Sequence, residues 1–385
     1  MKPTEKLYYI DAYIKEFDSY VLSCEKCEKG YDIVLEKTAF FPGEGGQYSD
    51  TGRIENAEVT EVILVDNIIH HYAESAVNVN ECVHCAINFE ERFDKMQQHT
   101  AEHIISGFFH KLYGVENTGF HLGSTDVTLD TSRPVTKEEI LTVEKLVNEA
   151  VCKNVKIETF FPKPNELSTL EYRSKLDLTE NVRIVNIGEY DSCACCAPHV
   201  AYTGEIGFVK IVDAVKHKGG SRIRMLAGSR AYDYIAKIAK EASAISVMLS
   251  APITDISSET EKLLLSKSAL EYKLSEMGKA TAALLAETLS ETNENKVVFY
   301  PMLDMDSLRV FINKASEKVK GTLVGLVGEE GSYKYILHSE SPDFQKIVKD
   351  ANTALSGRGG GRALMASGTF CANLSQIEEY FKTQK

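Results

Sequence analysis

The chain has 385 residues and a formal net charge of -13 at pH 7, with 43% hydrophobic and 26% charged residues. This length predicts several domains, and the composition is typical of a globular protein in water. No uncharged apolar run of about 18 residues occurs, which argues against a membrane span, and the acidic N-terminus lacks the apolar core of a signal peptide. We therefore expect a cytoplasmic protein with no membrane partner, in which any contact with nucleic acid depends on a local basic patch.

The nine cysteines are odd in number and unevenly clustered, which does not indicate a secreted disulfide framework. Such clusters favour metal binding or reactive thiols. Two CxxC pairs, Cys24/Cys27 and Cys82/Cys85, could supply four thiolates to a second, structural zinc ion. Their separation is much larger than in an ordinary zinc ribbon, so cysteines that simply pack in a β-domain are the default interpretation.

Residues 1–90 are expected to form a small β-barrel. The strand-like runs are Tyr20–Cys27, Tyr31–Thr38, Ala57–Val65 and Cys82–Phe89. The segment FFPGEGGQYSDTG at 40–52 contains glycines that permit an irregular, tightly folded loop.

An α+β domain is predicted for residues 91–230. Helical periodicity extends from Arg92 to Tyr113, and Gly114 is placed to cap this helix. A second helix should begin at Thr136, which forms a capping-box pair with Glu139. Strand-like segments follow at 155–161, 182–187, 207–213 and 221–227.

Residues 231–290 are expected to be a helical hairpin or a short coiled coil. Ser258 and Glu261 form a second capping-box pair at the start of a helix. An apolar heptad repeat follows, made of Leu263, Leu270, Met277 and Leu284, with Leu274 beside it. This pattern favours a homodimer through the C-terminal region, and a hairpin packed on its own chain is the alternative.

A small C-terminal α/β domain is predicted for residues 291–385. It alternates a strand at Lys296–Tyr300, a helix at 306–319, strands within 321–338, and helices at 342–355 and 374–384. The glycine-rich segment GRGGGR at 357–362 is expected to be a loop.

The segment QQHTAEHI at 97–104 is the first part of a predicted metal site. His99 and His103 are four residues apart in a helical stretch, so both imidazoles project from one face about a turn apart. This spacing suits two nitrogen ligands of one metal ion, although two surface histidines would show it as well. Thr100 follows the first histidine, where a peptidase HExxH motif needs glutamate, so zinc peptidase chemistry is not expected.

The segment CACCAPHV at 193–200 supplies the second part, because Cys195 and His199 are again four residues apart. Together the two segments offer three nitrogens and one sulfur, a set that zinc favours. Cys193 and Cys196 flank Cys195, and either thiolate could replace it. Cys195 is preferred because only this cysteine is four residues from His199.

Five ordered motifs resemble the alanyl-tRNA editing proteins known as AlaX and the editing domain of alanyl-tRNA synthetase. They are TAFFPGEGGQYSDTG (38–52), HTAEH (99–103), GFHLG (119–123), CCAPH (195–199) and GEIGFVKI (204–211). The GRGGGR segment resembles the glycine-rich loop of the C-terminal domain shared by these synthetases and DHH phosphoesterases. The resemblance covers nearly the whole chain, in the order of the long AlaX form. Editing domains of synthetases usually have glycines after the cysteine, where this chain has Cys196, Ala197 and Pro198.

The resemblance implies that His99, His103, Cys195 and His199 bind zinc, and that the substrate is tRNA(Ala) wrongly charged with serine or glycine. The implied reaction is attack of water on the aminoacyl ester. With four protein ligands, the ion has little room for a catalytic water, so we expect it to position the substrate and to help electrostatically.

Three further residues are expected to contact the substrate. Thr38 is the family-matched candidate for recognising the serine hydroxyl, Gln47 is expected to line the same pocket, and His121 to contact the terminal adenosine or the ester. An ordinary strand threonine and a packed histidine are the structural alternatives for Thr38 and His121.

A basic island is the predicted tRNA contact. Its residues are Lys210, Lys216, Lys218, Arg222, Arg224 and Arg230, with Arg358 and Arg362 beside the C-terminal glycines. A merely solvated charged hairpin is equally compatible with this pattern of charges.

Two other functions compete with editing. A DHH phosphoesterase would need an Asp-His-His metal motif, which does not occur in this sequence. The second alternative is a non-catalytic tRNA-binding or assembly protein in which zinc only holds the fold. Aminoacylation that depends on ATP is not expected.

Overall fold

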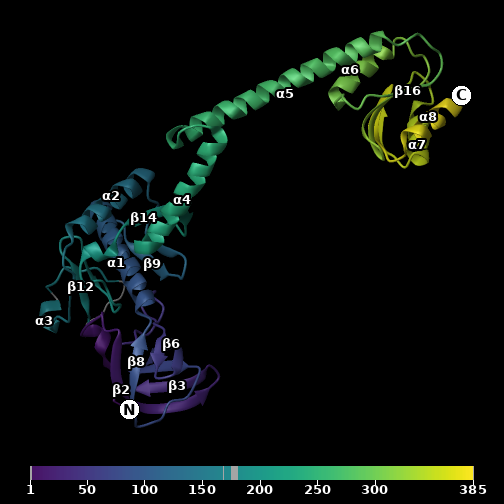
Figure 1. Ribbon diagram of the computed structural model, residues 1–385. Coiled ribbons are helices and arrows are strands. Elements are labelled where there is room, and N and C mark those ends of the chain that lie inside the picture. Colours follow the sequence, from purple (N-terminus) through teal and green to yellow (C-terminus); the bar gives the residue numbers. More distant parts are fainter. Residues whose placement is uncertain (1, 168, 175–180, 385) are drawn as a thin grey trace. The chain divides into compact units, whose positions relative to one another are not determined.

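A computed structural model describes residues 2–167, 169–174 and 181–384, and the chain divides into two compact units at Glu241/Ala242 (Figure 1). The described residues form a mixed α+β multidomain structure with eight α-helices and several β-sheets. None of the helices in these ranges has both the length and the apolar character needed to cross a lipid bilayer.

Six antiparallel strands of the first unit close into a barrel. In spatial order these are β2 (Glu16–Cys27), β3 (Gly30–Leu35), β7 (Ile68–Ala73), β6 (Ala57–Val65), β5 (Gly52–Ile54) and β8 (Cys82–Ile87). β8 returns to β2, where Tyr20 lies opposite Cys82. The interior is filled by apolar side chains such as Val21, Ile33 and Phe40. Outside the barrel, β1 (Glu5–Lys6) and β4 (Lys37–Thr38) form a short two-stranded parallel sheet.

Helix α1 (Phe89–Tyr113) follows the barrel and begins three residues before the predicted start. The Asn88 side chain accepts a hydrogen bond from the Glu91 amide, and Gly114 ends the helix with φ of 60°, as its predicted role as a cap requires. Residues of α1 such as Met96, Ile104 and Phe109 are buried in the central core of the first unit.

Two sheets and a second helix surround α1. Strands β14 (Val209–His217), β15 (Gly220–Ala227), β10 (Val127–Thr131) and β9 (Asn117–Leu122) form one sheet, and β11 (Glu158–Phe160), β12 (Ile184–Ile187) and β13 (Asp191–Ala194) form the other. Helix α2 (Lys137–Lys153) begins with the predicted capping box between Thr136 and Glu139. The short helix α3 (Pro164–Leu167) follows β11.

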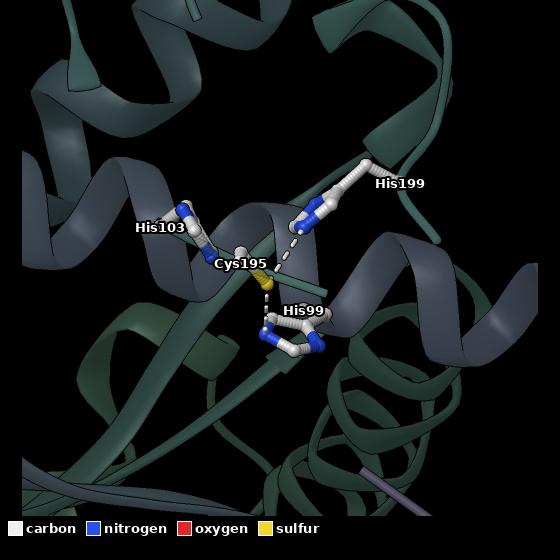
Figure 2. A group of neighbouring side chains, drawn as sticks. All are labelled: His99, His103, Cys195 and His199. Atoms are coloured by element: carbon white, nitrogen blue, oxygen red, sulfur yellow. Dashed lines mark hydrogen bonds between the residues drawn. The ribbon is translucent and has the colours of Figure 1, made fainter. Parts of the chain in front are cut away.

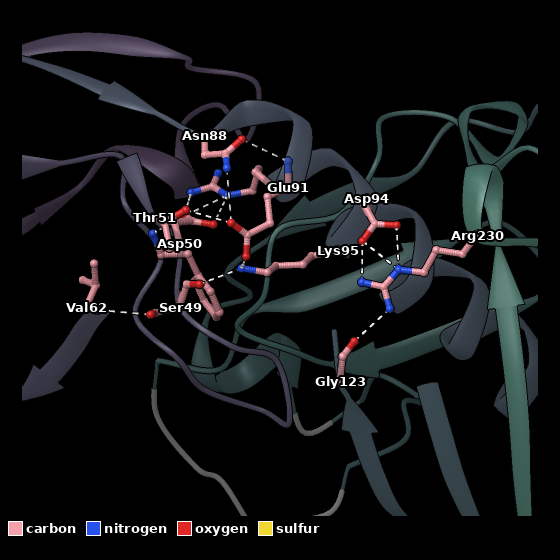
Figure 3. Close-up of polar contacts among 12 residues, drawn as sticks. Ser49, Asp50, Thr51, Val62, Asn88, Glu91, Asp94, Lys95, Gly123 and Arg230 are labelled. Atoms are coloured by element: carbon pink, nitrogen blue, oxygen red, sulfur yellow. Dashed lines mark hydrogen bonds and ion pairs between the residues drawn. The ribbon is translucent and has the colours of Figure 1, made fainter. Parts of the chain in front are cut away.

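The loop that precedes β5 is fastened to the first turns of α1. Arg92 is 1% exposed, and its Nε lies 2.9 Å from both carboxylate oxygens of the equally buried Asp50. Lys95 donates to the Ser49 carbonyl at 2.7 Å, and the Thr51 hydroxyl donates to Glu91 at 2.7 Å (Figure 3). The segment Ser49–Thr51 therefore fixes the barrel to this helix.

Helix α4 (Gly228–Leu249), the 3-10 turn η3 (Ile253–Asp255) and helix α5 (Ile256–Glu287) follow. The capping box predicted for Ser258 and Glu261 is wrong, because α5 begins at Ile256 and the Ser258 hydroxyl donates to the Asp255 carbonyl. The heptad side chains of α5 are exposed to solvent, with 58% for Leu263, 66% for Leu270 and 67% for Met277.

The second unit is built on a five-stranded sheet covered by helices on both faces. The strand order is β16 (Lys296–Phe299), β17 (Leu323–Glu329), β18 (Ser332–His338), β20 (Met365–Phe370) and β19 (Arg358–Arg362). Helix α6 (Met305–Ala315) and the end of α5 pack on one face. Helices α7 (Phe344–Ala354) and α8 (Leu374–Thr383) pack on the other.

The glycine-rich segment is an edge strand, β19, instead of the predicted loop. A Cβ atom on Gly361 would lie 2.0 Å from the Met365 carbonyl oxygen, and one on Gly359 would lie 2.6 Å from the Tyr335 hydroxyl. The absence of side chains therefore allows close approach of backbone in the sheet.

Candidate metal centre

Four side chains from two segments of the first unit converge on one point (Figure 2). His99 and His103 come from successive turns of α1, and Cys195 and His199 come from the segment that follows β13. One ligand atom from each of the four lies within 4.8 Å of all the others. The structure thus brings together the four residues predicted to hold a metal ion.

The distances between these atoms suit a tetrahedral zinc site. Cys195 Sγ lies 3.4 Å from His199 Nε2 and 3.7 Å from His99 Nε2. Zinc with ordinary bond lengths to sulfur and nitrogen places such a pair of ligand atoms about 3.5 Å apart. The arrangement of donors and their chemistry therefore fit this ion.

Each histidine of the cluster is held through its Nδ1 atom by a different residue. His99 Nδ1 lies 2.8 Å from the Gln47 side-chain oxygen, and His103 Nδ1 lies 3.0 Å from the Asp191 carboxylate. The third contact joins His199 Nδ1 to the Thr100 hydroxyl at 3.0 Å. Because the acceptors fix a hydrogen on each Nδ1, all three Nε2 atoms are free to bind a metal.

Thr100 and Asp191 contact two of the clustered histidines, and the sequence analysis assigned neither of them to the site. The Thr100 hydroxyl donates to the Met96 carbonyl at 2.7 Å, which leaves its oxygen to accept from His199. Asp191 lies between His103 and Arg173, whose Nε and Nη2 atoms are 2.7 and 2.8 Å from its two oxygens. The sequence offers a local signal for Thr100, because this residue lies inside the HTAEH motif. It offers no such signal for Asp191, which is 88 residues from His103.

The electrostatics of the cluster distinguish Cys195 from its neighbours. Burial would raise the pKa of the Cys195 thiol, but His99 and His199 outweigh it and hold this pKa well below the usual range. Burial raises the pKa of Cys193 to about 11 and that of Cys196 to about 12. Since the thiolate is the form that binds metal, Cys195 is the best of the three donors.

The two CxxC pairs do not form a second site in the part of the chain that is described. No group of three or more metal-binding side chains there includes Cys24, Cys27, Cys82 or Cys85. Cys85 is buried in the barrel, whereas Cys82 is exposed.

A cavity of about 1230 Å³ opens beside the four clustered residues, and His99, His103 and Cys195 form part of its wall. The wall also contains acidic, basic, aromatic and amide side chains, among them Tyr9, Glu44, Glu102, Asn117, Arg173 and Arg183. Three of the four clustered side chains thus border a space that is large enough to admit a ligand.

The three predicted substrate contacts lie outside the lining of this cavity. Gln47 is 3% exposed and touches the cluster through His99. Thr38 is fully buried, and its hydroxyl lies 2.9 Å from His71 Nε2. His121 is exposed on β9, with Nε2 at 3.3 Å from the Tyr48 hydroxyl. Of the three, the structure brings only Gln47 to the cluster.

Comparison with known proteins identifies relatives of this chain. The alanyl-tRNA editing protein AlaX-L of Pyrococcus horikoshii is 26% identical over 97% of this chain and 96% of its own length. The alanyl-tRNA editing protein Aarsd1 of Danio rerio is 25% identical over 92% of this chain and 90% of its own length. The expected resemblance to alanyl-tRNA editing proteins is confirmed.

Two family models match separate parts of this chain. The second additional domain of threonyl and alanyl tRNA synthetases matches residues 182–225, which include Cys195 and His199. The DHHA1 domain matches residues 293–384. The alanine–tRNA ligase of Ignicoccus hospitalis is 29% identical over 75% of this chain, which spans 32% of that ligase. The C-Ala domain of Aquifex aeolicus alanyl-tRNA synthetase aligns with 24% of this chain and 88% of its own length at 16% identity, with a TM-score of 0.20.

In this relative of the editing proteins, several predicted tRNA-binding cations are already paired. Lys210 lies 2.8 Å from Glu144, Arg222 lies 2.7 Å from Asp130, and Arg224 lies 2.8 Å from Asp213. Lys216 and Lys218 are exposed on and after β14, and Arg358 and Arg362 are exposed at the two ends of β19. Pairing leaves the basic island on β14 and β15 less positive than its sequence indicates.

Proposed function

We propose that this chain is a trans-editing hydrolase that deacylates mischarged Ser-tRNA(Ala), with Gly-tRNA(Ala) as a second substrate. One observation carries the proposal: in a relative of the alanyl-tRNA editing proteins, the cluster of His99, His103, Cys195 and His199 opens onto a cavity of about 1230 Å³. A purely structural metal site needs no such opening.

We propose zinc as the ion, held by these four side chains. Three nitrogens and one thiolate are a donor set that zinc favours. When bound, the ion would supply positive charge next to the ester. The chain itself holds the ligands in place through Gln47, Thr100 and Asp191.

The proposed reaction is hydrolysis of one ester bond. The oxygen of a water molecule bonds to the carbonyl carbon, the bond from this carbon to the terminal ribose oxygen breaks, and a proton passes to that oxygen. The products are the free amino acid and uncharged tRNA. Recognition of the serine hydroxyl by Thr38, lining of the pocket by Gln47 and contact of His121 with the terminal adenosine remain predictions.

We propose that Lys216, Lys218, Arg358 and Arg362 are the main contacts to the tRNA backbone, because the other predicted cations have acidic partners. Phosphate contacts of this kind depend strongly on salt. We also propose that the protein acts in the cytoplasm as a homodimer, with the exposed heptad of α5 as the contact.

The decisive experiment measures deacylation of Ser-tRNA(Ala), Gly-tRNA(Ala) and Ala-tRNA(Ala) by the purified full chain, before and after removal of zinc. The proposal predicts rapid release of serine or glycine while alanine stays attached. It also predicts that the single-turnover rate falls when zinc is removed from protein that remains folded.

The alternative is a non-catalytic tRNA-binding protein with structural zinc, which the four protein ligands favour because they fill a tetrahedral site. Protein that is folded, contains zinc and binds tRNA but hydrolyses none of the three esters would establish this alternative. An unchanged rate of deacylation in folded, zinc-free protein would support the hydrolase function and exclude a role for the ion in the reaction.

A further inference from the structure

Glu102 is a buried carboxylate in the wall of the cavity, on helix α1 directly before the ligand His103. It is 4% exposed. One of its oxygens, Oε1, accepts hydrogen bonds from the Ser106 hydroxyl and from Asn117 Nδ2, the latter at 2.5 Å. The other oxygen, Oε2, has no hydrogen-bond partner among the residues that the structure describes.

The other acidic side chains of the cavity differ from Glu102. Asp191 is also buried, but both of its oxygens are taken by Arg173 and His103. Glu116, Glu171 and Glu189 are exposed, and Glu44 is only half-buried. Glu102 therefore combines burial with a free oxygen, as no other acidic side chain in the described wall does.

A buried carboxylate with a free oxygen needs a cation or a donor to offset the loss of hydration. The charge of Arg173 lies near enough to interact with Glu102, but its Nε and Nη2 atoms donate to Asp191 and it forms no hydrogen bond with Glu102 among the described contacts. Asn117 and Ser106 fix the carboxylate from one side only. The free oxygen is thus oriented and available to a ligand that enters the cavity.

We propose that Glu102 binds the α-ammonium group of the aminoacyl ester, an inference that rests on the proposed function. An α-ammonium group has three donors and a positive charge, so it forms a charge-assisted hydrogen bond with a carboxylate. Glu102 and the metal ligand His103 are adjacent on one helix, so an amine held by Glu102 places the neighbouring ester beside the metal centre. The residue is a binding and positioning group for the substrate.

Every aminoacyl ester carries this amine, so Glu102 does not distinguish serine from alanine. It selects for a free amine, and esters whose nitrogen is acylated, such as peptidyl-tRNA, should bind poorly. The discrimination between serine and alanine then depends on contacts to the side chain alone.

The test uses two non-hydrolysable ligands, 3′-seryl-amido-adenosine and its counterpart with a hydroxyl in place of the α-amine. Their dissociation constants are measured by calorimetry on the zinc-loaded full chain and on Glu102→Gln. The amide oxygen of glutamine still accepts from Ser106 and Asn117, so this variant removes the charge while it keeps those contacts. Glu90→Gln, an exposed change on the same helix, is the matched control.

The native protein should bind the amine about 10- to 100-fold more tightly than the hydroxyl ligand. Glu102→Gln should lose most of this preference, with zinc content unchanged, and Glu90→Gln should keep it. Equal binding of the two ligands by the native protein would overturn the proposal, and this comparison needs no variant to fold. Equal weakening of both ligands in Glu102→Gln would also overturn it, because Glu102 would then act on a group that they share.

Failure of the proposed function gives a different result. If the native protein prefers the amine ligand but hydrolyses no aminoacyl-tRNA, the assignment of Glu102 stands and the hydrolase does not. If it hydrolyses Ser-tRNA(Ala) without any preference for the amine, only the assignment of Glu102 fails.

Discussion

The side-chain oxygen of Gln47 lies 2.8 Å from Nδ1 of His99, which joins the loop before β5 to a candidate metal ligand on α1. The Nε2 atom of Gln47 is buried and has no hydrogen-bond partner among the described residues. The amide is therefore held at the site at some cost in hydrogen bonding, which is consistent with a role in orienting His99.

Replacement Gln47→Leu should weaken zinc binding by about 10- to 100-fold, because it removes the acceptor that orients His99. Competition with a chromophoric chelator measures this affinity. Tyr48→Phe, a change at the next position of the same loop, should leave it unaltered. Equal zinc affinities for Gln47→Leu and the native protein would show that His99 needs no such support.

Replacement Cys195→Ser should abolish stoichiometric zinc binding, because the thiolate is the anionic ligand of the cluster. Cys196→Ser should retain the ion, since burial raises the pKa of Cys196 to about 12 and keeps it a thiol. Metal analysis of both purified variants gives the answer directly. Loss of zinc in Cys196→Ser and its retention in Cys195→Ser would make Cys196 the ligand.

The barrel should lose stability in acid because of His71. Burial lowers the pKa of this fully buried histidine to about 4, so it stays neutral in the folded protein while the unfolded chain binds a proton below pH 6.5 or so. The contribution is complete above that pH and is lost as the pH falls toward 4, by about 3 kcal/mol.

Urea denaturation between pH 7.5 and 4.5 measures this loss. The variant His71→Gln should show a smaller decrease in the free energy of unfolding of the first unit than the native protein. Parallel pH profiles for the two proteins would contradict the assignment to His71.

Replacement Leu270→Glu should convert the proposed dimer to a monomer. The leucine is 66% exposed within an apolar heptad seam of α5, and a charge at such a position opposes helix pairing. Sedimentation velocity on the native protein and on the variant measures the oligomeric state. Ser268→Glu, on an exposed position outside the seam, should remain dimeric, and a monomeric native protein would remove the seam as an interface.

Features set by neighbouring residues could be predicted from the sequence. The end of α1 at Gly114, the capping box at Thr136 and the strand Ala57–Val65 depend on short-range patterns, and the structure confirms them. Strands β5 and β7 were missed, because β5 has three residues and β7 carries two adjacent histidines. The two motifs of the candidate metal centre could be found because each pairs two metal-binding side chains four residues apart, the first on helix α1 and the second in the segment after β13.

Contacts between distant segments could not be predicted in this way. His71 holds the Thr38 hydroxyl across 33 residues of sequence, and no local pattern indicates that this threonine is fully buried. The contact between Asp191 and His103 likewise depends on the fold and has no local pattern in the sequence. The positive charge of β14 and β15 was overestimated, because the acidic partners of their cations, such as Glu144 and Asp130, lie on other elements.

The buried pair of Arg92 and Asp50 has a consequence for exchanging parts between proteins of this kind. Arg92 lies on the same helix as His99, two turns before it, while Asp50 belongs to the barrel. A chimera that brings in a foreign barrel without a matching aspartate would leave the guanidinium unpaired in the interior, at a cost of about 3–5 kcal/mol. The barrel and helix α1 must therefore be transplanted as one piece.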